Sequence, residues 1–297
     1  MVKQPFDEVL SFEEWNSRAA HHREILGSTV NDFLERRSRA AKHPVYDFLF
    51  TYYKFSPAQL LAWHPPLNTA LELGSSSDAQ TKNCSFYKIT GNARYLDASR
   101  ITSRIFRQAS WIIELCERIG DRLPRFGCYG LHEWAMVYKA EQIRHSVPLR
   151  LSQKEIANVV EENALVCSHY DAYRFFTPAA APMNVFKPSS LSRLEHEQSG
   201  CLHVNMDLYK WAYKLAPWIG SELIREAFLI AIQARRLDMR ASPYDLTSYG
   251  LTPICIENDE GKISYQKLQK DLSQSAASIR LRLLASAKKI SLYSKGE

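Results

Sequence analysis

The chain of 297 residues has few of the features that mark a specialised class of protein. Its six cysteines are scattered and form no CxxC pair, which argues against a zinc knuckle and against a disulfide framework. No segment approaches the roughly 20 consecutive apolar residues that a bilayer span requires. Residues 1–18 lack an apolar signal core. We therefore expect reduced thiols, a cytoplasmic location and no membrane partner.

The bulk composition is that of an ordinary globular protein, with 45% apolar residues and a mean hydropathy of -0.31. A formal net charge of +6 permits a polyanionic partner without specifying one. Some of the basic residues gather at helical spacing, for example Arg100, Arg104 and Arg107. Such a row fits a solvated helix face, or a surface that binds a nucleic-acid backbone.

Strand signals are also scarce, and the sequence predicts a mainly α fold: a single helical domain over 1–297 with long irregular loops and at most a small β-hairpin. Ser11 with Glu14, and Ser152 with Glu155, are capping-box patterns that mark helix starts. Helices are predicted over 11–42, 95–119, 152–166, 206–217, 221–240 and 264–293. The best strand is 253–257, with a turn at 258–261. Residues 1–10 are expected to form a disordered tail.

Two irregular segments interrupt the helical pattern. Residues 71–87 have the composition of a polar surface loop. Residues 177–200 contain three prolines and show no apolar period. A loop of that length inside a compact domain usually covers a site or is disordered, and this one lies between two histidine-containing segments. We therefore predict that 177–200 covers a functional site.

Histidines next to carboxylates are the most informative pattern in the chain. Four such pairs occur in segments rich in aromatic residues: His43 with Asp47, His132 with Glu133, His169 with Asp171, and His203 with Asp207. Imidazole beside carboxylate serves both general acid–base catalysis and metal ligation. The pattern predicts that distant parts of the chain bring these groups into one cavity.

The candidate catalytic residues are His132, Glu133, His169, Asp171, His203 and Asp207. Asp171 is the preferred acid, oriented by His169. If the segment 167–178 is extended, alternation places these two side chains and Tyr173 on one face. Each pattern also has a structural explanation. Asp171 can form a simple ion pair with Arg174, and the aromatic residues can belong to the core.

Several long strings resemble a known family. They are HPVYDFLFTYY, SPAQLLAWHP, RFGCYGLHEWAMVY, RHSVPLRL, SHYDAYRFFTP, GCLHVNMDLYKWAYKLAP and RLDMRASPYDL, which together extend over most of the chain. They look like an uncharacterised bacterial family, found mostly in actinobacteria, whose members usually carry the name 3-methyladenine DNA glycosylase.

This resemblance implies a DNA-repair hydrolase that excises alkylated purines from damaged double-stranded DNA without a cofactor. Such an enzyme extrudes the nucleotide and holds the cationic base between aromatic walls, while a carboxylate assists hydrolysis of the N-glycosidic bond. The candidate binding residues are Tyr52, Tyr53, Trp63, Trp134, Tyr173, Arg174, Lys210, Asp238 and Arg240.

The same residues support a second hypothesis. Histidine and carboxylate one helical turn apart can present two ligands to one metal ion, and a mixed nitrogen and oxygen set suits iron, manganese or zinc. The candidate ligands are His43, Asp47, His132, His169, His203 and Asp207. The protein would then be a helical metal-dependent oxygenase or hydrolase acting on a small anionic molecule. A non-enzymatic binding protein is a third hypothesis.

Overall fold

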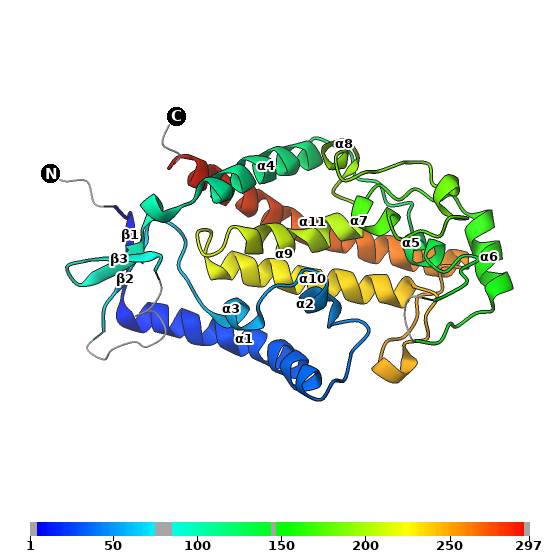
Figure 1. Cartoon of the computed structure of the whole chain (residues 1–297), viewed down its shortest axis with the longest axis horizontal. Helices are drawn as coiled ribbons and strands as arrows, with labels where there is room; N and C mark the ends of the chain where they lie inside the picture. The colour runs from blue at the N-terminus through cyan, green and yellow to red at the C-terminus, as the bar shows by residue number, and fades with distance from the viewer. Residues whose placement is uncertain (1–4, 75–84, 144–146, 294–297) are drawn as a thin grey trace.

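Three helices lie side by side through the centre of the molecule: α9 (Leu202–Lys214), α10 (Ser221–Ala241) and α11 (Asp259–Ser291) (Figure 1). The structure is a computed structural model that describes residues 5–74, 85–143 and 147–293. Helix α10 buries side chains on nearly every face, so it is the central element of the core. It packs against both α9 and α11.

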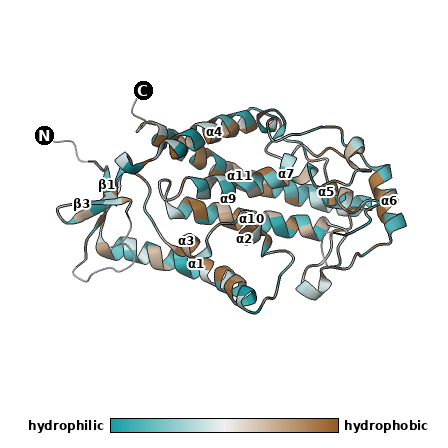
Figure 2. Ribbon diagram, viewed as in Figure 1, coloured by the Kyte–Doolittle hydropathy of each residue, from teal (hydrophilic) through white to brown (hydrophobic). Residues whose placement is uncertain are grey.

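Outer helices cover this centre with one apolar face each, as the alternating brown and teal along them in Figure 2 indicates. Helix α4 (Ser103–Gly120) packs on α11 and buries Ala109, Ile112, Leu115 and Ile119, which follow one another at helical spacing. Helix α1 (Phe12–Ser38) lies on the opposite side of the molecule (Figure 1). Its N-cap is Ser11, whose hydroxyl accepts a hydrogen bond from the Glu14 amide.

Short helices fill the connections between the long ones. They are α2 (Phe48–Thr51), α3 (Pro57–Leu61), α5 (Leu131–Ala135), α6 (Gln153–Glu162), α7 (Tyr170–Tyr173) and α8 (Arg193–His196), with 3-10 turns at η1 (Ala98–Arg100), η2 (Ala181–Met183) and η3 (Thr247–Tyr249). Helices α5 to α8 gather around one end of the central helices (Figure 1).

A small sheet lies at the other end, near the N-terminus (Figure 1). It contains β1 (Glu8–Leu10), β2 (Thr69–Glu72), β3 (Tyr87–Thr90) and β4 (Ala93–Leu96), in the order β1-β2-β4-β3. Strand β1 pairs in parallel with β2, and the other two pairings are antiparallel. Leu10 and Leu71 pack with Trp15 and Trp63 in a small second core.

The mainly α prediction is confirmed, since the structure is 55% helix and 8% strand. Outside the candidate site three local predictions are wrong, and the sheet has four strands where at most a small β-hairpin was predicted. Residues 8–10 are a strand and not a tail, because pairing with β2 buries Leu10. Residues 87–96 form a strand pair where a loop end and a helix start were predicted. Residues 1–4, and 75–84 of the predicted loop, lie outside the described residues.

The third wrong prediction is the strand at 253–257 followed by a hairpin turn. Residues 253–255 have no regular structure, and Asn258 is the N-cap of α11, where its side chain accepts a hydrogen bond from the Gly261 amide. A Cβ at Gly261 would lie 1.9 Å from the Cys255 carbonyl oxygen, so the chain comes too close there for any other residue. The apparent turn sequence is therefore a helix start.

Among the described helices, none combines the length and the apolar composition that crossing a membrane requires.

The partly buried histidine His64 predicts a pH-dependent stability. Its backbone amide donates to Ser221 Oγ, and its Nδ1 lies 3.0 Å from the Tyr87 hydroxyl. Burial, together with His22 and Arg94, lowers the pKa of His64 from 6.5 to about 4. Its contribution to stability is therefore present above pH 6.5 and is lost as the pH falls towards 4, because the unfolded chain takes up the proton first.

We expect this one group to remove about 3 kcal/mol over that interval. His64→Asn should therefore lose less unfolding free energy than the parent protein between pH 6.5 and pH 4, as measured by urea denaturation. Parallel stability curves for the two proteins would show that His64 does not titrate in this way.

Candidate functional site

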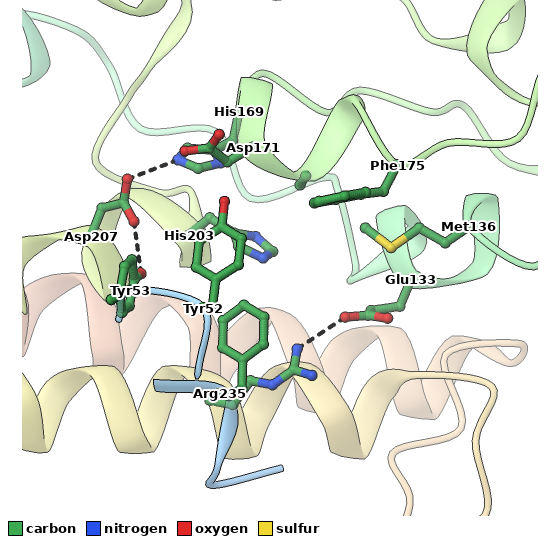
Figure 3. Close-up of a pocket in the computed structure, with 12 residues that line it drawn as sticks. Tyr52, Tyr53, Glu133, Met136, His169, Asp171, Phe175, His203, Asp207 and Arg235 are labelled. Atoms are coloured by element: carbon green, nitrogen blue, oxygen red, sulfur yellow. Dashed lines mark hydrogen bonds and ion pairs between the residues drawn. The ribbon is translucent and has the colours of Figure 1, made fainter. Parts of the chain in front are cut away.

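Eight titratable side chains meet where α5, α7, α9 and α10 approach one another, and Figure 3 shows several of them. None of these side chains is more than 13% exposed. We call them the histidine–carboxylate centre: His132, Glu133, His169, Asp171, Glu197, His203, Asp207 and Asp238.

Local structure explains why these side chains converge. On α9, His203, Asp207 and Lys210 follow at intervals of four and three residues and so share a face. Helix α5 begins directly after Gly130, which has a φ of 73° that favours glycine. The segment predicted to be extended is instead the helical turn α7, with His169 as its N-cap. His169 and Asp171 therefore do not share a strand face.

The first half of the centre is built around Asp238 on α10. His132 Nε2 lies 2.7 Å from Asp238 Oδ1, and His203 Nε2 lies 3.8 Å from Oδ2. Arg235 donates from Nη1 to Asp238 Oδ2 at 3.1 Å and to Glu133 Oε1 at 3.0 Å. The guanidinium also lies over the ring of Phe48. Two imidazoles and one arginine thus surround a single buried carboxylate.

The second half is built around Asp207 on α9. Its Oδ1 accepts a hydrogen bond of 2.7 Å from the Tyr53 hydroxyl, and its Oδ2 one of 3.1 Å from Lys210 Nζ. His169 Nε2 lies 3.4 Å from Asp207 Oδ2 and 3.6 Å from Glu197 Oε1. Neither ring nitrogen of His169 has a hydrogen-bond partner among the described residues. This imidazole is therefore positioned between two carboxylates with its hydrogen-bonding capacity unused.

Cations hold the remaining two carboxylates of this half. Lys210 Nζ lies 3.1 Å from Asp171 Oδ2, and Arg193 donates to the same carboxylate. Arg193 also donates to Glu197 Oε1 at 2.7 Å. Lys210 therefore bridges Asp171 and Asp207, while Arg193 bridges Asp171 and Glu197.

The ring of His203 joins the two halves. Its centroid lies 4.5 Å from that of His132, in a T-shaped arrangement, and 5.3 Å from that of His169, in a stacked one. The three imidazoles form one continuous row between Asp238 and Asp207. The centre is therefore one connected group of residues.

The charges in this group do not cancel if every carboxylate is ionised. The five carboxylates contact four permanent cations: Arg174, Arg193, Lys210 and Arg235. Burial of an uncompensated charge is costly, so protons or a bound cation must supply the difference.

The pKa shifts indicate where protons are held. Burial raises the pKa of Glu197 despite the nearby His169 and Arg193. Burial alone would lower the pKa of His132, but the Asp238 carboxylate raises it overall. In contrast, Lys210 and His169 hold the pKa of Asp207 well below its ordinary value against the effect of burial. Burial and the neighbouring His132 lower the pKa of His203 to about 3.

The centre encloses a cavity of about 30 Å³, which we call the inner cavity (Figure 3). His169, His203, Asp207 and Glu133 point into it. A cavity of this volume with charged side chains in its lining admits one or two water molecules or an ion, and is far too small for a nucleobase.

A larger and more open space of about 830 Å³, the vestibule, adjoins the inner cavity. Five residues line both: Phe48, Tyr52, Tyr53, Asp171 and Phe175. The vestibule presents five cations and one carboxylate, namely Lys54, Arg174, Arg193, Lys210, Lys214 and Asp171. Its charge and its aromatic walls therefore suit a small anion that carries a flat ring.

Many predicted site residues lie at the centre or in the vestibule. All six predicted catalytic residues belong to the centre, and so does Asp238. Of the predicted binding residues, four line the vestibule: Tyr52, Tyr53, Arg174 and Lys210. The 177–200 segment also contributes two residues to this region: Glu197, which belongs to the centre, and Arg193, which donates to Glu197 and Asp171.

The other predicted residues are engaged elsewhere. Asp47 accepts hydrogen bonds from Arg36 and from the His43 amide, so this pair stays outside the centre. Trp63 belongs to the second core. The side chains of the remaining three each donate a hydrogen bond to a backbone carbonyl: Trp134 to that of Ala241, Tyr173 to that of Ala181, and Arg240 to that of Thr252.

The sequence patterns missed one residue of the centre, Glu197, and two arginines that contact the centre, Arg193 and Arg235. Arg193 and Glu197 follow at an interval of four in a segment that shows no apolar period, so only their mutual spacing could have drawn attention to them. Arg235 and Asp238 share a face of α10, and an arginine three residues before an acid in so apolar a helix is a usable signal.

Two sets of side chains have ligand atoms close enough together to hold a metal ion, among the described residues. They are His132 with His203 and Asp238, and His169 with Asp171 and Asp207. In each set the ligand atoms lie within 4.8 Å of one another. Neither set includes His43 or Asp47.

Comparisons of this chain with protein-family models, curated proteins and solved structures found no match.

The buried ion pairs predict a large cost for removing Arg235. Without its guanidinium, Glu133 and Asp238 keep two buried carboxylates with no arginine to compensate them, so Arg235→Met should lower the unfolding free energy by about 3–5 kcal/mol. The matched control is Arg282→Met, which breaks a surface pair with Glu226 and should cost about 1 kcal/mol or less. Equal costs in urea denaturation would mean that the buried pairs contribute no more than a surface pair.

Proposed function

We propose that the protein is a hydrolase that cleaves a small anionic substrate carrying a flat ring. One observation carries the proposal: a cavity lined in part by charged side chains, with room for water, adjoins a cation-lined vestibule with room for a small molecule. The two reactants of a hydrolysis, water and substrate, would thus occupy neighbouring spaces. Asp171 lines both.

The vestibule residues would bind and orient the substrate. The half-buried Lys214 and the exposed Arg174 attract its anionic group, and Tyr52, whose hydroxyl accepts a hydrogen bond from Arg174, offers a ring face to its flat part. Arg193 and Lys210 add positive potential while holding Asp171. A neutral or cationic substrate would be disfavoured.

His169 is the proposed general base. It lines the inner cavity, and neither of its ring nitrogens is engaged in a hydrogen bond with the described residues. When it removes a proton from water, the resulting imidazolium lies beside Asp207 and Glu197 and is stabilised by both. Asp171, with a pKa that Lys210 and Arg193 hold down against burial, stays ionised at the border of the two spaces. There it can stabilise positive charge that develops on the substrate.

Excision of alkylated bases from DNA is the second candidate function, and Asp171 is the observation that favours it. An ionised carboxylate, whose pKa is lowered by Lys210 and Arg193, beside Tyr52 and Tyr53 is what an oxocarbenium-like sugar and a cationic base would require. The excess of cations in the vestibule suits DNA phosphates, but it opposes a positively charged base. For this reason we place the small anionic substrate first.

The first test is a search for product. Purified protein is incubated with nucleoside monophosphates and other small aryl anions, and separately with methylated duplex DNA, and the products are separated by chromatography. Hydrolysis of a small anion, with no release of 3-methyladenine, is the expected result. Base release from DNA without cleavage of any small anion would replace our first proposal with the second. Binding of these anions without turnover would indicate a binding protein.

The second test is the role of His169. His169→Gln should lower kcat/KM at least about 100-fold, because the general base is lost. The matched control is His196→Gln. His196 belongs to the 177–200 segment, its ring nitrogen Nδ1 contacts the Ser192 carbonyl, and it lines neither the inner cavity nor the vestibule. If both variants retain the parent activity, His169 is not the base.

A further inference from the structure

The two possible metal-binding sets differ in what already occupies them. In the His169 set, the Lys210 ammonium lies 3.1 Å from both Asp171 and Asp207, where a metal ion would have to bind. An ion would have to displace this lysine. The His132, His203 and Asp238 set has a permanent cation on one carboxylate oxygen only: Arg235 Nη1 lies 3.1 Å from Asp238 Oδ2, whereas Oδ1 contacts His132.

The spacing of this set fits one ion. Zinc and related ions lie about 2.0–2.2 Å from nitrogen and oxygen ligands, so two ligand atoms of one ion are at most about 4.4 Å apart. Asp238 Oδ1 lies 2.7 Å from His132 Nε2, and Asp238 Oδ2 lies 3.8 Å from His203 Nε2. Both separations fall inside this limit, and the shorter one, which is a hydrogen bond, would have to lengthen when an ion binds.

The surroundings of Asp238 match those of a metal-bound carboxylate. Arg235 donates to Asp238 Oδ2 and is itself held by Glu133 Oε1. Ligating carboxylates are commonly fixed by such outer hydrogen bonds. The arginine therefore leaves Oδ1 to His132, and an ion that binds there would replace the proton between Oδ1 and His132 Nε2.

A second observation points to a ligand at the same place. Glu133 is 3% exposed, and its Oε2 has no hydrogen-bond partner among the described residues. Glu133 and His203 both line the inner cavity. A buried carboxylate oxygen without a partner is costly unless a ligand satisfies it.

We propose that His132, His203 and Asp238 bind one divalent transition-metal ion, next to the inner cavity. Two imidazoles and one carboxylate are the donor set of many zinc, manganese and non-haem iron sites that keep a coordination position free. The ion would also supply the positive charge that the five carboxylates of the centre lack. The proposal concerns binding only and does not depend on the hydrolase activity.

Metal binding to the stripped full-length protein tests this directly. The protein is treated with a chelator, dialysed, and titrated in the calorimeter with Zn²⁺, Mn²⁺ and, without oxygen, Fe²⁺. We expect one equivalent of at least one of these ions per chain. His203→Gln should weaken its affinity by about 100-fold or more, since even loss of an outer partner costs roughly 10- to 100-fold.

The variants make the outcomes distinct. The side chain of His203 has no hydrogen bond among the described residues, so the His203→Gln variant should fold. Circular dichroism verifies that it does. The matched control is His169→Gln, which alters the other set and should bind the ion with unchanged affinity. Co²⁺ provides a second readout, because its visible absorption should change in His203→Gln and not in His169→Gln.

Three results would overturn the proposal: no binding of any of the three ions, equal affinity in His203→Gln, or loss of binding in His169→Gln alone. The last would place the ion in the set that contains Lys210. Because no substrate is present, none of these results bears on hydrolysis.

Discussion

Mutual neutralisation of buried charge is the constraint on which the rest of the site depends. Asp207 and Asp238 lie deep between the central helices. Asp207 is tolerated there because Lys210 and the Tyr53 hydroxyl contact it, and Asp238 because Arg235 and His132 do. These partners come from α9, α10, α5 and the segment directly after α2. Packing α9 against α10 therefore requires the short helices at that end of the molecule to be in place.

Such a network is expensive for a protein that needs only stability. Well-packed apolar residues of similar volume are often as stabilising as a buried ion pair, or more so. The centre also leaves polar atoms of His169 and Glu133 without partners among the described residues, next to a cavity that opens towards a cationic vestibule. A cost of this kind, concentrated at one place, is typical of a site that holds a ligand or carries out a reaction.

The sequence predicted where the site lies better than how it is connected. His132, His169 and His203 do converge, but each faces a carboxylate other than the one next to it in sequence. Residues one or two apart on a helix point in different directions, so Glu133 and Asp171 could not serve their neighbours. The long helices followed from apolar period and capping residues. The sheet was missed because β1 pairs with a strand some 60 residues away, and its strands have only three or four residues.

The central claim is that the imidazole of His169 serves catalysis and does not contribute to stability. The unfolding free energy of His169→Leu tests this claim most directly. Asp207 retains Tyr53 and Lys210 in this variant, and Glu197 retains Arg193. The account predicts an unfolding free energy within about 1 kcal/mol of the parent protein, or above it, because two unsatisfied buried nitrogens are removed. A loss of more than about 3 kcal/mol, as for breaking a buried ion pair, would contradict it and make His169 a structural residue.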